Sequence, residues 1–230
     1  MDYFLQAFQQ AFALIFSLDG EVYAVAWTSV RISLTAVFFA ALIGVPLGLL
    51  VSFKRFTGKA FLRQILNTLM ALPTVVVGLL LYGLLTRQGP MGDWGILYTP
   101  VAIIIGQCVL ILPIIWNLSI SAADSADPRL AATCRALGAS EFQQGLVFLK
   151  EVRFALMAAL VTGFGRAIGE VGIAMMLGGN IEGFTRTMTT AIALETMKGE
   201  FEFALALGML LLLVAFLVNA LLQYAQRLDQ

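Results

Sequence analysis

Two oppositely charged residues stand four positions apart inside a long apolar stretch of the sequence. Arg166 and Glu170 occur in GFGRAIGEVGIAMM, and a helix would place them one turn apart on one face. Charges within an apolar run are costly, so they normally pair and face protein or a water-filled cavity. Two explanations stay open. The pair neutralises itself and locks its helix to a neighbour, or it lines a path for a polar solute.

Hydrogen-bond donors gather in the polar segment that follows this run. The segment GGNIEGFTRTMTT carries one amide, one guanidinium and four threonine hydroxyls. Such donors suit an oxyanion, a docking surface for another protein, or a solvated loop, and composition does not choose among these. The predicted pathway or helix-pairing residues are therefore Arg166, Glu170, Asn180, Thr185, Arg186 and Thr187.

The rest of the sequence contains no motif typical of a catalytic or metal-binding site. There is no histidine, which removes the usual proton shuttle and the commonest metal ligand. Cys108 and Cys134 have neither disulfide nor metal-site spacing. No Walker A sequence and no nucleophile elbow occurs. We expect no catalytic, cofactor-binding or metal-binding residue, so the energy for any active transport must come from a partner or an ion gradient.

Composition places the chain in a membrane. Of its 230 residues 60% are hydrophobic and 12% charged, more apolar surface than a soluble domain can bury. Five segments approach the roughly 20 apolar residues that cross a bilayer: 29–53, 62–85, 99–120, 154–177 and 203–224. Pro46, Pro73 and Pro113 interrupt three of them, and Gly44 with Gly48 permits close helix approach. The sequence predicts an all-α integral membrane protein with about five spans.

The first residues differ from these spans. A helix over this region would place Gln6, Gln9 and Gln10 on one face and Phe8 with Phe12 on another, a pattern typical of a helix in the membrane interface. No basic region precedes it, so we predict no signal peptide. We expect 1–28 to be an extracytoplasmic interfacial segment and 29–230 to be the transmembrane domain, although a sixth span is an alternative.

Basic residues set the predicted orientation. The first thirty residues contain no Lys or Arg, whereas two loops are rich in them. These loops carry Lys54, Arg55, Lys59, Arg63, Arg129, Arg135, Lys150 and Arg153. Because positive loops remain in the cytoplasm, we predict an N-terminus outside the cell, a cytoplasmic loop over 122–153 and a cytoplasmic C-terminus.

The loop 122–153 contains the signals of two short helices. Asp127 suits an N-cap and Pro128 the first helical position. Gly138 suits the left-handed residue that ends a helix. Ser140 can then cap a second helix, with Gln143 at the capping-box spacing. The sequence predicts a rigid helix–turn–helix docking element, and an ordinary polar loop is the alternative.

Two motifs resemble those of a known family. ATCRALGAS followed by FQQGLVFL resembles the cytoplasmic signature of ABC-importer permeases, E-A-A-x-x-x-G and then I-x-L-P. Gly138 matches the family glycine, whereas 132–134 and 148–151 depart from E-A-A and I-x-L-P. GRAIGEVGIAMMLGGNIEGFTRTMTT is similar to the G-R-A-x-G-E-x-G and M-x-x-G-N-I-x-G-x-T-x-T-M of molybdate and tungstate permeases. The run TRTMTTAIALET and LKE in place of L-P resemble the tungstate permeases more.

This resemblance implies a type I ABC-importer permease for tungstate that forms a homodimer in the inner membrane. Two cytoplasmic ATPase subunits would bind ATP and Mg²⁺, and this chain would not hydrolyse ATP. An extracytoplasmic binding protein would deliver the oxyanion, which would pass along the two-fold axis. The residues implied to contact the ATPase are Arg135, Ala136, Leu137, Gly138, Ala139, Ser140, Glu141 and Phe142.

Other functions stay open at this point. A molybdate or sulfate importer would share the same architecture. An ion-coupled carrier acting alone usually needs more spans and an internal repeat, which the sequence lacks. A membrane enzyme would need reactive side chains clustered at one depth, and only Arg166 and Glu170 qualify.

Overall fold

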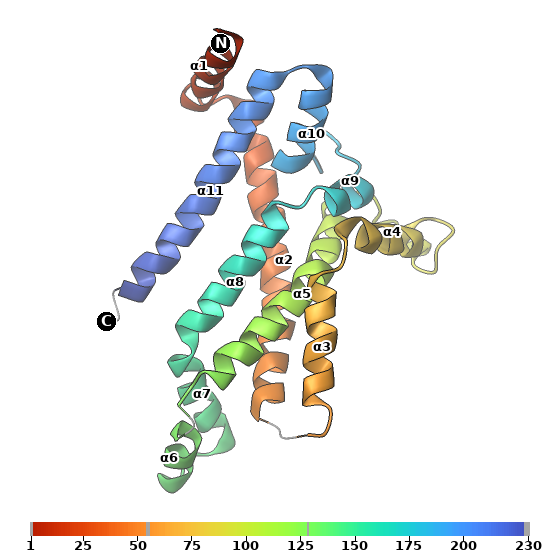
Figure 1. The fold of residues 1–230 in the computed structure, drawn as a ribbon. Helices are drawn as coiled ribbons and strands as arrows, with labels where there is room; N and C mark the ends of the chain where they lie inside the picture. The colour runs from red at the N-terminus through yellow and green to blue at the C-terminus, as the bar shows by residue number, and fades with distance from the viewer. Residues whose placement is uncertain (1, 54–55, 128, 228–230) are drawn as a thin grey trace.

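The computed structural model describes residues 2–53, 56–127 and 129–227, and within them all the regular secondary structure is helical (Figure 1). This confirms the predicted all-α class. The elements are α1 (Asp2–Phe16), α2 (Gly20–Phe53), α3 (Lys59–Met70), α4 (Thr74–Leu85), the 3₁₀ helix η1 (Gly92–Trp94), α5 (Pro100–Asp124), α6 (Leu130–Ala136), α7 (Glu141–Glu151), α8 (Arg153–Ile168), α9 (Gly172–Gly178), α10 (Met188–Lys198) and α11 (Phe201–Arg227).

Three helices are long and apolar enough to cross a membrane by themselves, namely α2, α5 and α11. Two further spans are bent pairs: α3 and α4 meet at 92°, and α8 and α9 meet at 61°. Counting each pair as one span gives the five predicted. Pro73 is the N-cap of α4 and so marks the first break. Pro46 and Pro113, predicted to interrupt their spans, instead lie inside continuous helices.

The centre of the fold is the close packing of α2 against α5. A methyl group added to Gly44 would lie 3.2 Å from the backbone nitrogen of Trp116. One added to Gly48 would lie 2.5 Å from Cβ of Ser119 and 3.0 Å from the Trp116 carbonyl oxygen. The glycine pair therefore brings the two backbones together, as its spacing predicted.

This contact gives a stability prediction. Gly48→Ala inserts a methyl group into space already filled by α5, and overpacking of this kind typically costs about 1–3 kcal/mol. We expect a lower Tm and a smaller yield of monodisperse protein in detergent. Gly208→Ala in α11 is the matched control, because no described atom lies within 4 Å of its added methyl group. Equal Tm changes in the two variants would contradict the role given to the α2–α5 contact.

Three helix ends are tied together beside α6 and α7. The Asp124 carboxylate, at the end of α5, accepts hydrogen bonds from Ser52 Oγ (2.5 Å) and Lys59 Nζ (3.4 Å), and it pairs with Arg63. These partners belong to the end of α2 and the first turns of α3. The cluster fixes the spans where the chain leaves them for the 122–153 loop.

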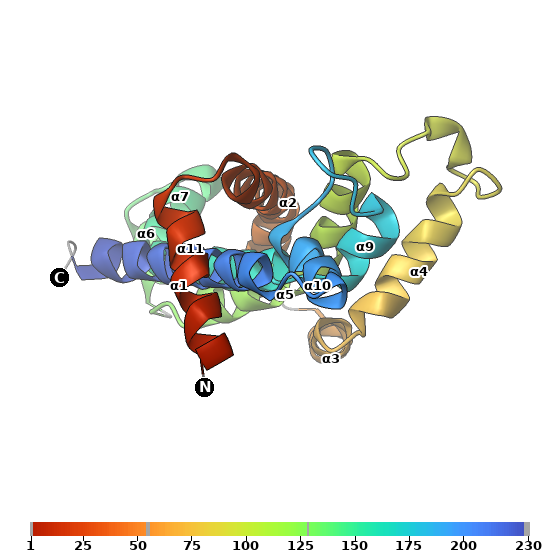
Figure 2. The same cartoon turned by 90° about the horizontal axis from the view of Figure 1, so that it is seen from above.

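The N-terminal helix α1 packs against α11. Seen from above, α1 lies across the first turns of α11 (Figure 2), and it buries Ala7 and Ala11 completely. Phe12, on the predicted apolar face, is 47% exposed. The helix α2 begins at Gly20 rather than at 29, because the Asp19 carboxylate accepts hydrogen bonds from the first backbone N–H groups of α2.

Candidate functional site

The turn between α6 and α7 has the predicted geometry. Gly138 has φ of +74°, and its N–H donates to the Arg135 carbonyl while the Ala139 N–H donates to the Cys134 carbonyl, both at 3.0 Å. These two bonds form a Schellman motif, which requires a left-handed residue at Gly138. The turn is thus fixed by backbone bonds, and its angle depends on the glycine.

The predicted capping box after the turn is also present, whereas the N-cap of α6 is Arg129 and not Asp127. The Gln143 N–H donates to Ser140 Oγ (3.3 Å) and the Ser140 N–H donates to Gln143 Oε1 (2.8 Å), a complete capping box at the start of α7. Before α6, the Asp127 carboxylate accepts from the Arg129 N–H at 2.8 Å. The predicted first helical residue, Pro128, lies outside the described residues. The alternative of an irregular polar loop is therefore wrong.

The α6–α7 element has an anchored end and a projecting end (Figure 1). Phe148 and Val152 are buried in a cluster with Ala122, Ala123 and Leu156, which joins α7 to α5 and α8. At the other end Leu137 and Phe142 are 81% and 77% exposed. Apolar side chains that project from the spans in this way are typical of a protein-binding surface.

The helix α7 connects almost directly to α8. Only Val152 separates them, its N–H donates to the Phe148 carbonyl, and its carbonyl accepts from the Leu156 N–H, both at 3.0 Å. No loop intervenes that could absorb a displacement. A movement of α7 must therefore be passed to α8, whose last turn contains Arg166.

Arg166 and Glu170 form the predicted ion pair, with 2.8 Å between Nη1 and Oε2. They do not lie on one continuous helix, however, because α8 ends at Ile168 and Glu170 falls in the break before α9. The second carboxylate oxygen, Oε1, accepts from the Ile173 N–H at 3.1 Å and so caps α9. Glu170 is 3% exposed, whereas the side chain of Arg166 is 35% exposed.

Neighbouring helices donate side-chain hydrogen bonds to backbone carbonyls at the break. Gln107 in α5 donates from Nε2 to the Ala167 carbonyl (3.0 Å), and Thr189 in α10 donates to the Glu170 carbonyl (2.8 Å). Within a membrane such groups need protein partners. Gln107 was not among the predicted site residues, although a lone amide inside an apolar run was a signal for it.

The polar segment after α9 is exposed at Gly179 and over 181–184, but its threonines are buried and are not solvated donors. Thr185 and Thr187 are 0% and 3% exposed. Thr185 Oγ1 donates to the Gly178 carbonyl (2.6 Å) and accepts from the Ile181 N–H (2.9 Å), and Thr187 forms a capping box at the start of α10. The threonine hydroxyls therefore stabilise the backbone of this segment. Asn180 has φ of +51°, and its buried Oδ1 has no hydrogen-bond partner among the described residues.

Arg186 joins three segments through carboxylates. Its guanidinium lies 3.4 Å from Glu21 at the start of α2, 3.4 Å from Glu182 and 3.8 Å from Glu195 in α10. Lys198 and Glu200 line the same open cleft. Four carboxylates against two cations would repel an oxyanion, so Arg186 acts as a structural link between the segments.

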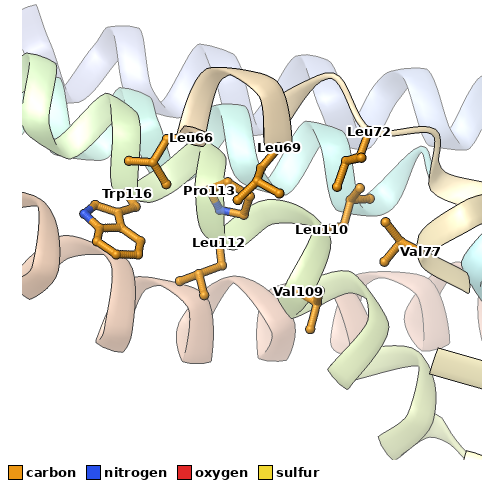
Figure 3. Close-up of a pocket in the computed structure, with 9 residues that line it drawn as sticks. All are labelled: Leu66, Leu69, Leu72, Val77, Val109, Leu110, Leu112, Pro113 and Trp116. Atoms are coloured by element: carbon orange, nitrogen blue, oxygen red, sulfur yellow. The ribbon is translucent and has the colours of Figure 1, made fainter. Parts of the chain in front are cut away.

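An apolar groove lies between the α3–α4 bend and α5 (Figure 3). Its lining is almost entirely aliphatic, apart from the Trp116 ring: Leu66, Leu69, Leu72, Val77, Val109, Leu110, Leu112, Pro113 and Trp116. The groove presents no charged group. The groove therefore does not suit an anion. Arg166 and Glu170 remain as a charged pair within a bent span.

The chain matches known proteins along most of its length. Residues 44–228 match the model of the family "Binding-protein-dependent transport system inner membrane component". The chain is 37% identical to the tungstate uptake system permease protein TupB of Peptoclostridium acidaminophilum over 226 residues, 98% of this chain and 99% of the relative. It is 39% identical to TupB of Campylobacter jejuni over 219 residues, 95% and 92% of the two chains.

A solved structure shares the fold. The crystal structure of a bacterial alginate ABC transporter, in complex with an alginate pentasaccharide-bound periplasmic protein, contains a chain with TM-score 0.76 and 18% sequence identity. The match covers 96% of this chain and 85% of that one. The chain thus shares its overall fold with a chain of that ABC transporter. On the family match and the two full-length relatives, the chain belongs to the family of binding-protein-dependent transport system inner membrane components.

Proposed function

We propose that this chain is the permease subunit of an ATP-driven importer of tungstate. The observation that carries the proposal is the similarity, over almost the whole chain, to two permeases named for tungstate uptake. In this account two copies form the translocation pathway, and an extracytoplasmic binding protein supplies the anion. Two cytoplasmic ATPase subunits bind ATP and Mg²⁺, and this chain hydrolyses no ATP.

The α6–α7 element is the proposed contact with the ATPase. The residues from Arg135 to Phe142 surround the Gly138 turn, and Leu137 and Phe142 offer exposed apolar side chains to a groove. ATP-driven closure of the ATPase pair would displace this turn. Because α7 continues into α8 through Val152 alone, the displacement would reach the Arg166–Glu170 break. The pathway would then alternate between two conformations.

The proposed orientation is N-terminus outside and C-terminus in the cytoplasm, from the positions of basic residues. Single cysteines at Gln10 and Gly58, both exposed positions, test it in a variant without Cys108 and Cys134. An impermeant thiol reagent, applied to cells whose outer membrane has been made permeable, is expected to label Gln10→Cys and to spare Gly58→Cys. Lysing the cells should make Gly58→Cys reactive. The reverse pattern in intact cells would overturn the orientation.

Tungstate selectivity can be tested in cells. A strain that lacks this gene is expected to lose tungsten accumulation from low external tungstate, and re-expression should restore it. Cellular tungsten and molybdenum would be measured by mass spectrometry, with excess molybdate or sulfate as competitors. Restoration that molybdate or sulfate abolishes at equal concentration would favour the molybdate or sulfate importer. Accumulation that continues after ATP is depleted would favour an ion-coupled carrier.

A further inference from the structure

Arg166 and Glu170 differ sharply in exposure, although they form one ion pair. The carboxylate of Glu170 is buried and uses both oxygens, one for Arg166 Nη1 and one for the Ile173 N–H. The guanidinium of Arg166 has five N–H donors in total. Its only hydrogen bond within the described part of the chain is the one from Nη1 to Glu170. The remaining edge of a 35% exposed side chain is therefore free to donate.

The depth of Arg166 decides what this free edge can face. At 1.5 Å per residue, Arg166 lies about 20 Å along α8 from Arg153, in a hydrocarbon layer about 30 Å thick. An arginine exposed to lipid at the centre of a helix costs at least about 2.5–3.5 kcal/mol. The exposed edge must then face water or protein. No other part of the described chain covers it, so that environment lies outside the single subunit.

The surface around Arg166 also differs from a lipid-facing one. Exposed small residues recur at helical spacing along α8 and at its C-cap: Ala155, Thr162, Gly165 and Gly169. On α11, by contrast, Leu212 and Phe216 are 72% and 69% exposed. Only Met157, at 36%, is an exposed large apolar side chain among the α8 residues. Small residues leave room for a solute beside the guanidinium, which large aliphatic side chains would fill.

We propose that the exposed face of α8 borders the water-filled pathway between two copies of this chain, and that the free edge of Arg166 donates hydrogen bonds to the oxyanion as it passes. This inference rests on the proposed function, since it assumes an anion substrate and a dimer. Glu170 stays buried and holds Arg166 in place. Planar N–H donors on a permanent cation suit an oxyanion. A carboxylate turned away from the path does not repel that anion.

Thiol accessibility tests the first half of this proposal. Thr162→Cys lies one turn from Arg166 on the exposed face, and Leu212→Cys on α11 is the control. Both are made without Cys108 and Cys134 and assayed in open membrane vesicles containing the assembled complex. We expect Thr162→Cys to react with a charged thiosulfonate, faster with an anionic reagent than with a cationic one, while Leu212→Cys stays unreactive. Unreactive Thr162→Cys in a complex that imports tungstate would overturn the inference and leave the proposed function intact.

Uptake by variants with altered charge tests the second part of the proposal, the hydrogen bonds from Arg166 to the oxyanion. Arg166→Lys keeps the charge but loses the planar donor edge, and Arg166→Gln with Glu170→Gln removes both charges together. Loss of a charge-assisted hydrogen bond predicts uptake lowered by about tenfold or more in the double variant. ATPase stimulation by loaded binding protein should persist there, and the anionic and cationic thiosulfonates should now react with Thr162→Cys at similar rates. Normal uptake by the double variant would assign both charges a purely structural role. Absence of tungstate uptake by the unmodified complex would instead overturn the proposed function, whatever the labelling shows.

Discussion

Replacement of Glu170 by glutamine is expected to lower the yield of assembled permease. The carboxylate is 3% exposed, pairs with Arg166 at 2.8 Å and caps α9 through Ile173. Removing one partner of a buried pair typically costs about 3–5 kcal/mol, and the partial exposure of Arg166 places the loss toward the lower end. Since folded domains are typically stable by only about 5–15 kcal/mol, we expect less dimer by size-exclusion chromatography with light scattering.

The double variant Arg166→Gln with Glu170→Gln is the control for this prediction. It removes the unpaired cation that the single variant leaves in the span, so more dimer should assemble than with either single change. The glutamine that replaces Glu170 can still accept a hydrogen bond from the Ile173 N–H through its amide oxygen. If both single variants assemble and transport like the unmodified protein, the pair is not needed for the fold or the pathway.

Replacement of Gly138 by valine is expected to uncouple the permease from its ATPase without harming the spans. Gly138 has φ of +74°, and a β-branched residue in that conformation costs on the order of 1–2 kcal/mol. No described atom lies within 4 Å of an added methyl group, so the penalty arises from the backbone and not from a clash. The Schellman turn would open and α6 would meet α7 at another angle. We expect normal membrane insertion, weaker ATPase co-purification and loss of transport-coupled ATPase stimulation.

Gly138→Asn separates conformation from side-chain bulk at this position. Asparagine enters the left-handed region far more readily than valine, so this variant should keep most of the ATPase stimulation. Both variants would be compared by dimer yield, ATPase stoichiometry and stimulation by loaded binding protein. A Gly138→Val complex with normal stoichiometry and normal stimulation would show that the turn does not dock the ATPase.

The sequence predicted the structure best where the conformation depends on residues a few positions apart. The Schellman turn at Gly138 and the capping box of Ser140 with Gln143 depend on neighbours within a few residues, and both were predicted correctly. The glycine pair of α2 was also predicted, because small residues in an apolar helix have few other uses. The number of spans followed from hydropathy alone.

The breaks within the spans depend on tertiary contacts, which the sequence does not display. Pro73 lies at a break, as the N-cap of α4, while Pro46 and Pro113 lie inside continuous helices, although all three interrupt apolar runs. The break at Glu170 is stabilised by Gln107 and Thr189, which come from two other helices. Composition likewise could not show whether the hydroxyl groups of the threonines near Arg186 were free to bind a ligand.

Burial decides what composition left open for those threonines. Their hydroxyls bond to backbone groups of the same segment, and four carboxylates surround the arginine and lysine of the adjoining cleft. An anion site predicted from donor types alone therefore needs the exposed fraction of each donor. By that criterion Arg166 remains a candidate to contact an anion, whereas the buried Thr185, Arg186 and Thr187 do not.

Uptake by the purified complex tests the central claim most directly. The permease would be reconstituted into proteoliposomes with its ATPase and its binding protein, and accumulated tungsten, molybdenum and sulfur would be measured with each oxyanion supplied alone and in competition. We predict accumulation of tungstate that requires ATP and binding protein, resists excess sulfate and is lost with Gly138→Val. Tungstate entry without ATP, or an assembled complex that accumulates another oxyanion and not tungstate, would contradict the account.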